Sequence, residues 1–588
     1  MHAVGLLALF ACHDTWSQSF QDGDVQGDLY TNHVGGYLGH GVSMADFNGD
    51  GHDDLTFTQF EGELHLYAGD GQGNFQPINL GVSNTGGEGK CPLWADFDGD
   101  GDQDLLITQR LAPNRLYARM DDGFLQEVPN AGGMAGSEIE RTFGASVADY
   151  DQDGRLDVYL CHYHSPQTNS EQNVLYRGVT GTDLSMAFED VTATAGVGNG
   201  VKQSFQSTWI DVDRDGLLDL HVINDRTFWP DALYRNLGDG TFEDMAADWG
   251  IGVGIYSMSS SFGDFDNDLD WDILVANGAD LGNYFLRCEG TPFLVDEGIG
   301  SYFNYANVAS EAGVLLDNLS WGAMWFDFNN DGWQDLYIGT GTSLYTDYPA
   351  VTNYYPNSTN GLFINPGGTL PLLDVSSDIN DENELTFCVA HGDHNGDGAL
   401  DFVSHRMGAR ARLFNGVASG KHWLSVLLKP EVGHPDGIGT SLTLWNDGIP
   451  QSRTVTCGSQ YMSQNSRRIH FGLNNATSVD SLVIQWPGGD QTTLSLDQVD
   501  QRIEVNEAGL ISISVPGCTY PMACNYDASA VDDDGSCDMS CACGQGTVWD
   551  ASTQQCMVFC PADHDGSGVV GAGDLILFLT WFGDTCTE

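Results

Sequence analysis

Acidic and amide side chains alternate with other residues in one nine-residue stretch, "DFNGDGHDD", which runs from Asp46 to Asp54. Oxygen-bearing side chains stand at its positions 1, 3, 5 and 9, and glycines at positions 4 and 6. Two carboxylates about 4 Å apart repel by roughly 4 kcal/mol at an effective dielectric constant near 20, so crowding them requires a compensating charge. These oxygens, with the backbone carbonyl of position 7, form a ligand set that suits Ca²⁺ better than Mg²⁺. The stretch therefore predicts a calcium-binding turn.

The same turn occurs seven times along the chain. The expected ligands occupy positions 1, 3, 5, 7 and 9 of each copy: Asp46, Asn48, Asp50, His52 and Asp54; Asp96, Asp98, Asp100, Asp102 and Asp104; Asp149, Asp151, Asp153, Arg155 and Asp157; Asp211, Asp213, Asp215, Leu217 and Asp219; Asp264, Asp266, Asp268, Asp270 and Asp272; Asp327, Asn329, Asp331, Trp333 and Asp335; Asp393, Asn395, Asp397, Ala399 and Asp401. The fifth copy has Leu269 where the others have glycine, so we expect a weaker or distorted site there. Solvated acidic turns are the alternative, since Asp-Gly is common in turns. Seven copies in register favour calcium in a structural role.

Further strand patterns recur at the same spacing as the turns. Each turn joins two short apolar segments, and an apolar-aromatic pair such as Leu66-Tyr67 follows it. A fourth strand, such as "FEDV" at Phe188, follows in the first six repeats but not in the seventh, while "FQD" at Phe20 precedes the first turn. Four-stranded units spaced 50 to 66 residues apart are typical of propeller blades. The sequence therefore predicts an all-β fold with a seven-bladed β-propeller over residues 20–417, whose last blade is completed by the N-terminal strand.

The charge balance limits the classes of partner. The 588 residues include 83 Asp and Glu against 21 Lys and Arg, giving a formal net charge of −62. Such a surface repels nucleic acid and anionic membranes, and no later stretch is long and apolar enough to span a bilayer. The composition excludes nucleic-acid binding and suits divalent cations.

Residues 418–510 lack the acidic turn and show alternating strand patterns, including "GIGTSLTLW", "GSQYMSQNSRRIHFGL" and "VDSLVIQWPGG". This set resembles the ASPIC/UnbV domain, and the acidic turns resemble the FG-GAP/VCBS repeats of integrin α-chain propellers. The order of the two is similar to that in cartilage acidic protein and bacterial relatives. The resemblance implies a propeller followed by a small β domain, in an extracellular calcium-binding protein with no established catalytic mechanism. Arg467, Arg468 and His470 form a cationic spot, for which pairing with nearby carboxylates is favoured over a ligand site.

The two ends of the chain carry signals of export. Residues 1–19 contain "MHAVGLLALFAC", which is typical of a signal peptide's apolar core and, as an imperfect lipobox, leaves lipidation of Cys12 as an alternative. Eight of the fourteen cysteines lie between Cys518 and Cys586, a density that favours disulfides over zinc and indicates an oxidising compartment. The tail divides into a cysteine-rich module, residues 516–560, and a final segment, residues 561–588.

The final segment contains "DHDGSGVVGAGDLILFLTWFG". Oxygen ligands for one further Ca²⁺ are expected from Asp563, Asp565, Ser567, the Val569 carbonyl and Asp574, followed by an apolar helix. This EF-hand-like loop and helix resembles one half of a dockerin, a module that attaches proteins to a scaffold. The cysteine-rich module resembles one found in exported proteins of marine Bacteroidetes, which implies a secreted or outer-surface protein of a marine bacterium.

Two functions remain open from the sequence. The favoured one is a non-enzymatic binding or adhesion platform for an extracellular protein or glycan, attached through its tail or through a lipidated Cys12. The alternative is a carbohydrate-active enzyme, a polysaccharide lyase or hydrolase, or its scaffold-docked accessory subunit. A lyase needs a base within a cleft, and His162, His164, His391 and His394 are the best candidates. Each of them is more simply explained as a loop decoration, so no catalytic residue is assigned.

Overall fold

The computed structural model describes residues 20–22, 37–83, 85–164, 171–180, 186–278, 282–289, 303–316, 318–341, 359–379, 385–407, 409–417 and 420–514. The chain divides into two units, Met1–Ile513 and Ser514–Glu588. The second unit contributes only the backbone of four short strands: β38 (Pro516–Gly517), β39 (Asp532–Asp533), β40 (Thr547–Asp550) and β41 (Gln555–Val558). The expected leader with Cys12, the cysteine-rich module's pairing and the loop from Asp563 to Asp574 lie outside the described residues. No helix in the described residues is long and apolar enough to cross a membrane.

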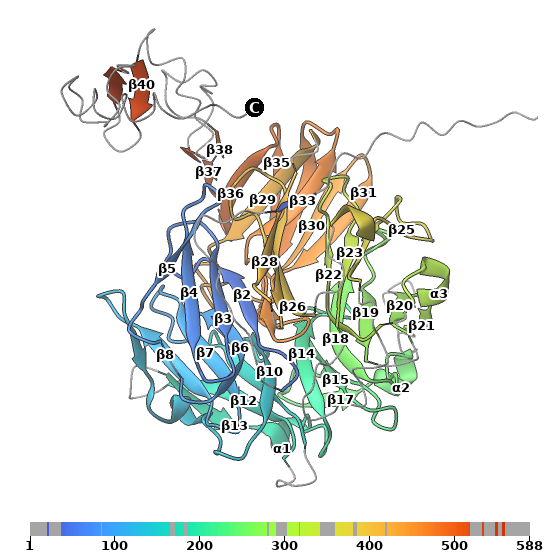
Figure 1. Cartoon of the computed structure of the whole chain (residues 1–588). Helices are drawn as coiled ribbons and strands as arrows, with labels where there is room; N and C mark the ends of the chain where they lie inside the picture. Colours follow the sequence, from blue (N-terminus) through green and yellow to red (C-terminus); the bar gives the residue numbers. More distant parts are fainter. Residues whose placement is uncertain are drawn as a thin grey trace, which may run out of the picture. The chain divides into compact units, whose positions relative to one another are not determined.

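Seven antiparallel sheets follow one another along the first unit, coloured from blue to yellow in Figure 1. The first three are β2 (Val42–Ala45), β3 (Asp54–Thr58), β4 (Leu64–Gly69) and β5 (Phe75–Ile78); β6 (Glu88–Ala95), β7 (Asp104–Arg110), β8 (Arg115–Arg119) and β9 (Leu125–Glu127); and β10 (Thr142–Ala148), β11 (Asp157–His162), β12 (Val174–Thr180) and β13 (Met186–Asp190). The next three are β14 (Ser204–Ile210), β15 (Asp219–Asn224), β16 (Ala232–Asn236) and β17 (Phe242–Asp244); β18 (Ser257–Gly263), β19 (Asp272–Asn277), β20 (Tyr284–Cys288) and β21 (Tyr305–Asn307); and β22 (Ser320–Phe326), β23 (Asp335–Thr340), β24 (Gly361–Ile364) and β25 (Leu373–Asp374). The predicted four-stranded blades are confirmed.

One turn of helix follows the fourth strand in five of these sheets. These turns are η1 (Pro129–Gly133), α1 (Thr192–Ala195), α2 (Ala246–Trp249), α3 (Ala309–Ala312) and η2 (Ser376–Asp378). The three α turns each end at a glycine in the left-handed conformation, where a β-carbon would be strained. Each turn leads the chain from the outer strand of one blade toward the inner strand of the next.

The seventh blade is built from both ends of the propeller. It contains β26 (Thr386–Gly392), β27 (Asp401–Arg406) and β28 (Arg412–Gly416), and its fourth strand is β1 (Phe20–Asp22). Phe20 pairs with Gly416 across the antiparallel ladder, and its ring lies 5.0 Å from that of Phe402. The inner strands β2 and β26 of the first and last blades are in contact, so the ring of blades is closed. The predicted displacement of the N-terminal strand into the last blade is confirmed.

The residues after the propeller form two further four-stranded sheets. One has the order β33 (Ile469–Asn474), β29 (His422–Leu428), β36 (Gln501–Asn506) and β37 (Gly509–Ser514). The other has the order β31 (Ile449–Thr454), β30 (Ser441–Asn446), β34 (Val479–Gln485) and β35 (Gln491–Leu496). Alternate residues of β34, including Leu482 and Ile484, are fully buried, as expected for strands with one face on a shared core.

Residues 455–466 of this second domain, the central insert, leave its sheets and enter the ring of inner strands. The short strand β32 (Ser463–Gln464) pairs in parallel with β2 and adds a fifth strand to the first blade. The Gln464 side chain accepts from the Trp94 amide and donates to the Trp94 carbonyl, both at 2.8 Å. The Val147 amide donates to the Cys457 carbonyl at 2.9 Å. The insert therefore joins blades one, two and three.

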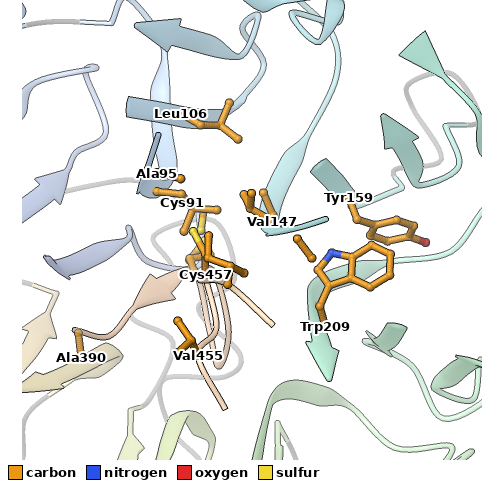
Figure 2. Close-up of a cluster of buried hydrophobic side chains, with 14 of the residues drawn as sticks. Cys91, Ala95, Leu106, Val147, Tyr159, Trp209, Ala390, Val455 and Cys457 are labelled. Atoms are coloured by element: carbon orange, nitrogen blue, oxygen red, sulfur yellow. The ribbon is translucent and has the colours of Figure 1, made fainter. Parts of the chain in front are cut away.

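The central insert also contacts the other four blades. The Met462 amide donates a hydrogen bond to Gln206 Oε1 of the fourth blade, and Gln460 forms an isolated β-bridge with Ser260 of the fifth. The ring of Tyr461 packs against that of Trp321 in the sixth blade, and the Ser466 amide donates to the His391 carbonyl of the seventh. Figure 2 shows Val455 and Cys457 among side chains of the inner strands, such as Cys91 and Val147. Because Cys457 and Tyr461 are 2 % and 0 % exposed, the insert is part of the propeller's core.

Candidate metal centres

Each acidic turn connects the first and second strands of one blade, and its first carboxylate shapes the turn. In the first copy, Asp46 accepts hydrogen bonds from the Asp50 amide at 3.1 Å and from the Gly51 amide at 2.9 Å. Gly51 has φ 91°, a left-handed conformation that side chains disfavour. The expected ligand positions are therefore brought together by a local backbone fold rather than by distant contacts.

The carboxylate at position 9 begins the second strand and is buried in every copy. Asp54 accepts from the Phe47 amide at 3.0 Å and from the Gly69 amide at 2.9 Å. In five other copies the equivalent two amides donate to the position-9 carboxylate, which is Asp104, Asp157, Asp219, Asp272 or Asp401. This residue ties the turn to the third strand of its blade, so the turn and blade hold each other in place.

Position 7 is held in the same way in all seven turns. Its amide donates to the carboxylate at position 5 at 2.8–3.1 Å, in the order His52, Asp102, Arg155, Leu217, Asp270, Trp333 and Ala399. The side chain at this position varies widely, so what the seven turns share here is the backbone conformation, and binding of an ion by the carbonyl stays a prediction.

Carboxylate oxygens converge in four of the turns. In the second, third and fourth copies, one oxygen from each of positions 1, 3 and 9 lies within 4.8 Å of the others: Asp96, Asp98 and Asp104; Asp149, Asp151 and Asp157; Asp211, Asp213 and Asp219. In the fifth, positions 1, 3 and 5 converge, at Asp264, Asp266 and Asp268. The first, sixth and seventh copies have Asn at position 3 and therefore offer an amide oxygen among their carboxylates. These groups can hold a metal ion, and oxygen donors of this kind suit Ca²⁺.

The buried carboxylates in these turns are costly to ionise without a cation. Burial, together with the nearby Asp46 carboxylate, raises the pKa of Asp54 to about 8, and burial with the Asp98 carboxylate raises that of Asp104 to about 8. Burial and the Asp213 charge raise the pKa of Asp211 to about 7. A bound divalent cation favours the charged form of every such group.

Some carboxylate oxygens in the turns are also left without a partner. Asp151 Oδ1, Asp266 Oδ1 and Asp393 Oδ1 are buried and have no hydrogen-bond partner among the described residues. Buried polar atoms are rarely left unpaired. These carboxylate oxygens are therefore suited to bind a positively charged group that no side chain provides. The donor set of the turns therefore fits a divalent cation.

The fifth turn keeps the shape of the others despite its leucine. Leu269 has φ 79°, in the left-handed region that glycine occupies in the other copies, and its amide lies 3.2 Å from Asp264 Oδ2. A non-glycine residue in this conformation costs roughly 1–2 kcal/mol. The fifth turn therefore differs from the others by backbone strain at Leu269, while its carboxylate oxygens still lie close together.

Cationic side chains approach several turns, which the sequence analysis did not identify. Arg235 on β16 pairs with Asp213 and, at 3.0 Å, with Asp215 in the fourth turn. Burial raises the pKa of Asp151 and of Asp266 in the third and fifth turns, and the charges of Arg177 and Arg287 respectively offset part of this rise. These three arginines stand at a repeated place, close behind the apolar-aromatic pair, so the sequence did carry a signal for them.

The second domain covers the same face of the turns with its own polar groups. At the second turn, His434 Nε2 lies 2.6 Å from the Asp96 carbonyl and Asp436 accepts from the Asp96 amide at 2.8 Å. Lys421 Nζ lies 3.7 Å from Asp331 at the sixth turn, and Arg502 Nη2 lies 3.5 Å from Asp393 at the seventh. The geometry of the turns and the docking of the second domain therefore depend on each other.

Most of the cationic spot of the second domain belongs to this contact. Arg467 pairs with Asp436, and His470 Nε2 donates to Asn330 Oδ1 at 2.7 Å. The favoured interpretation, pairing with a nearby carboxylate, holds for Arg467, whereas His470 pairs with an amide oxygen instead. The Arg468 side chain differs, because it makes no hydrogen bond or ion pair with the described residues.

The four histidines considered for catalysis do not form a site together. His162 Nδ1 lies 2.8 Å from the Gln172 carbonyl, and His394 Nε2 lies 3.0 Å from Asn415 Oδ1. Burial lowers the pKa of both rings and lowers that of His391 to about 3. His162 lies in the third blade and His391 and His394 in the seventh, so the candidates are divided between two blades that are not neighbours.

Comparisons with known proteins agree with the order of the two domains. A model of FG-GAP-like repeats matches residues 46–107, 96–160 and 168–275, and a model of ASPIC and UnbV matches residues 431–511. The chain therefore contains FG-GAP-like repeats followed by an ASPIC/UnbV domain. Such a combination suggests an extracellular binding or adhesion module. No curated protein matches the chain.

Two solved structures show a distant likeness to the chain. The crystal structure of BBS1N in complex with ARL6DN, soaked with mercury, has 8 % identity and a TM-score of 0.36, with 68 % of this chain and 98 % of that chain covered. The exotype rhamnogalacturonan lyase YesX has 12 % identity and a TM-score of 0.34, with 65 % of this chain and 72 % of that chain covered. Likeness at this level implies nothing about what this chain binds.

Proposed function

We propose that the chain is a calcium-stabilised extracellular binding or adhesion platform, in which the seven acidic turns each hold one Ca²⁺. The observation that carries the proposal is the convergence of carboxylate oxygens in successive turns, three of them within 4.8 Å of one another in each of four turns, with at least one buried residue in each set. Positions 1, 3, 5 and 9 would bind the ion through side chains and position 7 through its carbonyl. Calcium would act as a structural ion, because every turn lies inside a hairpin of one blade.

The ligand of the platform would be an extracellular protein or glycan. The central insert fills the ring of inner strands, and the second domain covers the face of the acidic turns, as the contacts of Tyr461 and His434 indicate. A large partner would therefore bind elsewhere on the propeller. Export would follow from the apolar N-terminal segment, and attachment from the dockerin-like loop or from a lipidated Cys12.

Calcium binding is tested on the chelated and exchanged protein. Since the unfolded chain has no preformed sites, bound Ca²⁺ stabilises the native state by about 2.7 kcal/mol per site when free calcium is 100 times the dissociation constant. We expect chelation to lower the melting temperature strongly, and Ca²⁺ to restore it better than Mg²⁺. A melting temperature that is indifferent to chelation would contradict the proposal.

A pair of variants assigns the ion to the turns. Asp98→Asn removes the charge at position 3 of the second turn, where burial raises the pKa of the carboxyl to about 6. Asp102→Asn removes the same charge at position 7, whose side chain is exposed. We expect calcium titration to show weakened binding at one site in Asp98→Asn and no change in Asp102→Asn. Equal effects of the two variants would indicate a general attraction of cations by the acidic surface.

Attachment is tested separately at the end of the chain. The double variant Asp563→Ala with Asp574→Ala removes two expected ligands of the tail loop. If this loop docks the protein, the variant is released into the medium with the propeller's melting temperature unchanged. If the variant stays attached, anchoring belongs to another segment, for which Cys12 is the next candidate.

A further inference from the structure

A cavity lies between the propeller and the second domain, beside the sixth acidic turn. Its volume is about 120 Å³, more than the space that one water needs. The propeller contributes Thr208 and Trp325 to its wall, and the second domain contributes Arg453, Arg468 and His470. A cavity lined from both domains is fixed by their packing and is thus preformed in the folded chain.

Two guanidinium groups line this cavity in a chain with a net charge of −62. Arg453 donates to the Ser452 carbonyl at 2.8 Å and more weakly to Gln451 Oε1 at 3.4 Å, and makes no ion pair within the described residues. Arg468 makes no side-chain hydrogen bond or ion pair there, and its Nη1 atom is buried. Both side chains are half-buried and have carboxylates in electrostatic range but no ion-pair partner within 4.0 Å among the described residues, so an anion in the cavity would give each of them a close partner.

A neutral donor joins the two arginines. The Trp325 side chain is 4 % exposed, and its Nε1 atom has no hydrogen-bond partner among the described residues. The indole nitrogen is only a donor, so it needs an acceptor that these residues do not provide. Donors of three side chains from two domains thus line one space.

The carboxylate of this cavity is already engaged. Asp327 accepts from the Gly332 amide at 2.7 Å and from the Asp331 amide at 3.1 Å in the sixth acidic turn. It therefore belongs to the backbone of its turn, and it forms no ion pair within 4.0 Å of Arg453 or Arg468 among the described contacts. Asp327 acts on the Arg453 charge only at longer range, so an anion in the cavity would be its first close ionic partner.

We propose that this cavity binds a small oxyanion, such as a sulfate or a carboxylate, held by Arg453, Arg468 and Trp325. Guanidinium groups bind oxyanions through paired, charge-assisted hydrogen bonds, which are stronger than neutral ones. His470 lines the same cavity: its Nε2 donates to Asn330, so its unpartnered Nδ1 is free to accept a hydrogen bond from a protonated ligand oxygen. The inference does not depend on calcium, because none of these groups is an expected calcium ligand.

The test measures anion binding to the intact chain. Equilibrium dialysis with labelled sulfate and, in a second arm, labelled acetate is performed at fixed ionic strength, with calcium present and after chelation. We expect saturable binding of one anion per chain, and the two arms tell a tetrahedral from a planar oxyanion. Absence of saturable binding in both arms would overturn the proposal and leave the cavity to water.

Variants locate the binding in the cavity. Arg468→Gln removes the unpaired charge, and Trp325→Phe removes only the Nε1 donor from a buried ring. Arg115→Gln is the matched control, because Arg115 is a half-buried arginine that pairs with Glu127 and does not line the cavity. We expect affinity to fall at least tenfold in Arg468→Gln, to fall less in Trp325→Phe and to stay unchanged in Arg115→Gln.

The outcome remains informative if one variant folds poorly. Near-ultraviolet circular dichroism establishes that each variant retains its tertiary structure, and Trp325→Phe changes no charge at the domain interface. Wild-type affinity in both folded cavity variants would place the anion elsewhere and overturn the proposal. If the wild-type chain binds the anion but does not bind calcium, the proposed function is contradicted and the anion site is not.

Discussion

The hydroxyl of Tyr461 donates a hydrogen bond of 2.8 Å to the backbone carbonyl of Leu38, across 423 positions of the sequence. The Tyr461 ring is fully buried and lies 5.4 Å from the ring of Phe205 and 5.3 Å from that of Trp321. A single side chain of the second domain thus contacts the first, fourth and sixth blades. The two domains share one core at this point.

We expect Tyr461→Ala to destabilise the propeller and the second domain together. Removing a buried aromatic side chain costs about 3–5 kcal/mol, whereas Tyr461→Phe removes only the hydrogen bond and costs about 1 kcal/mol. Urea unfolding followed by tryptophan fluorescence measures both, since tryptophans lie in both domains. A separate early transition of the second domain in Tyr461→Ala, with the propeller unchanged, would show that the insert is not part of the common core.

The closure of the ring depends on Phe20, which is 3 % exposed and contacts rings of the sixth and seventh blades. We expect Phe20→Ala to cost about 3–5 kcal/mol and to lower hydrogen-exchange protection around Phe402 and Leu413. Phe75→Ala is the matched control, because Phe75 begins the fourth strand of the first blade and is also buried. Loss of protection confined to the first blade in Phe20→Ala would be evidence against closure through β1.

The strain at Leu269 gives a prediction of the opposite sign. Leu269→Gly removes the β-carbon from a residue with φ 79°, which we expect to relieve roughly 1–2 kcal/mol of strain. Leu269→Ala loses much the same packing but keeps the β-carbon, so the difference in unfolding free energy between the two variants isolates the backbone term. Calcium-loaded protein in chemical denaturation provides the measurement. Equal stability of the glycine and alanine variants would mean that the turn is not strained.

Buried His221 makes stability depend on pH. Burial lowers its pKa from 6.5 to about 3. Between these values the unfolded chain takes up a proton that the folded chain does not, so stability falls as the pH falls through this window. We expect His221→Gln to lose less stability than the wild type between pH 7 and about pH 4.5, at constant calcium concentration.

A packing control separates titration from size for this histidine. Phe262 lies against the His221 ring at 5.4 Å, and Phe262→Leu disturbs the same packing without removing a titratable group. Its pH dependence should match that of the wild type in urea unfolding. Identical slopes for wild type and His221→Gln would assign the acid sensitivity of the protein to other groups.

Local pattern in the sequence determined the blades and the acidic turns. The ligand positions of a turn lie within nine residues, as from Asp46 to Asp54, so hydrogen bonds over four or five positions suffice to gather them. The displaced strand at Phe20 was also predictable. The seventh repeat has only three strand patterns, and one further strand pattern precedes the first repeat, so the latter can complete the seventh blade. Both inferences use only spacing along the chain.

Only the tertiary structure decided how the second domain meets the propeller. Tyr461 reaches Leu38, and Gln464 reaches Trp94, over hundreds of positions, and no periodicity along the chain encodes such a pairing. The sequence marked Arg467 and Arg468 as one cationic spot, yet the fold pairs the first with Asp436 and leaves the second facing a cavity. The difference arises because the environment of a buried charge is set by the surfaces that enclose it, and these surfaces come from different domains.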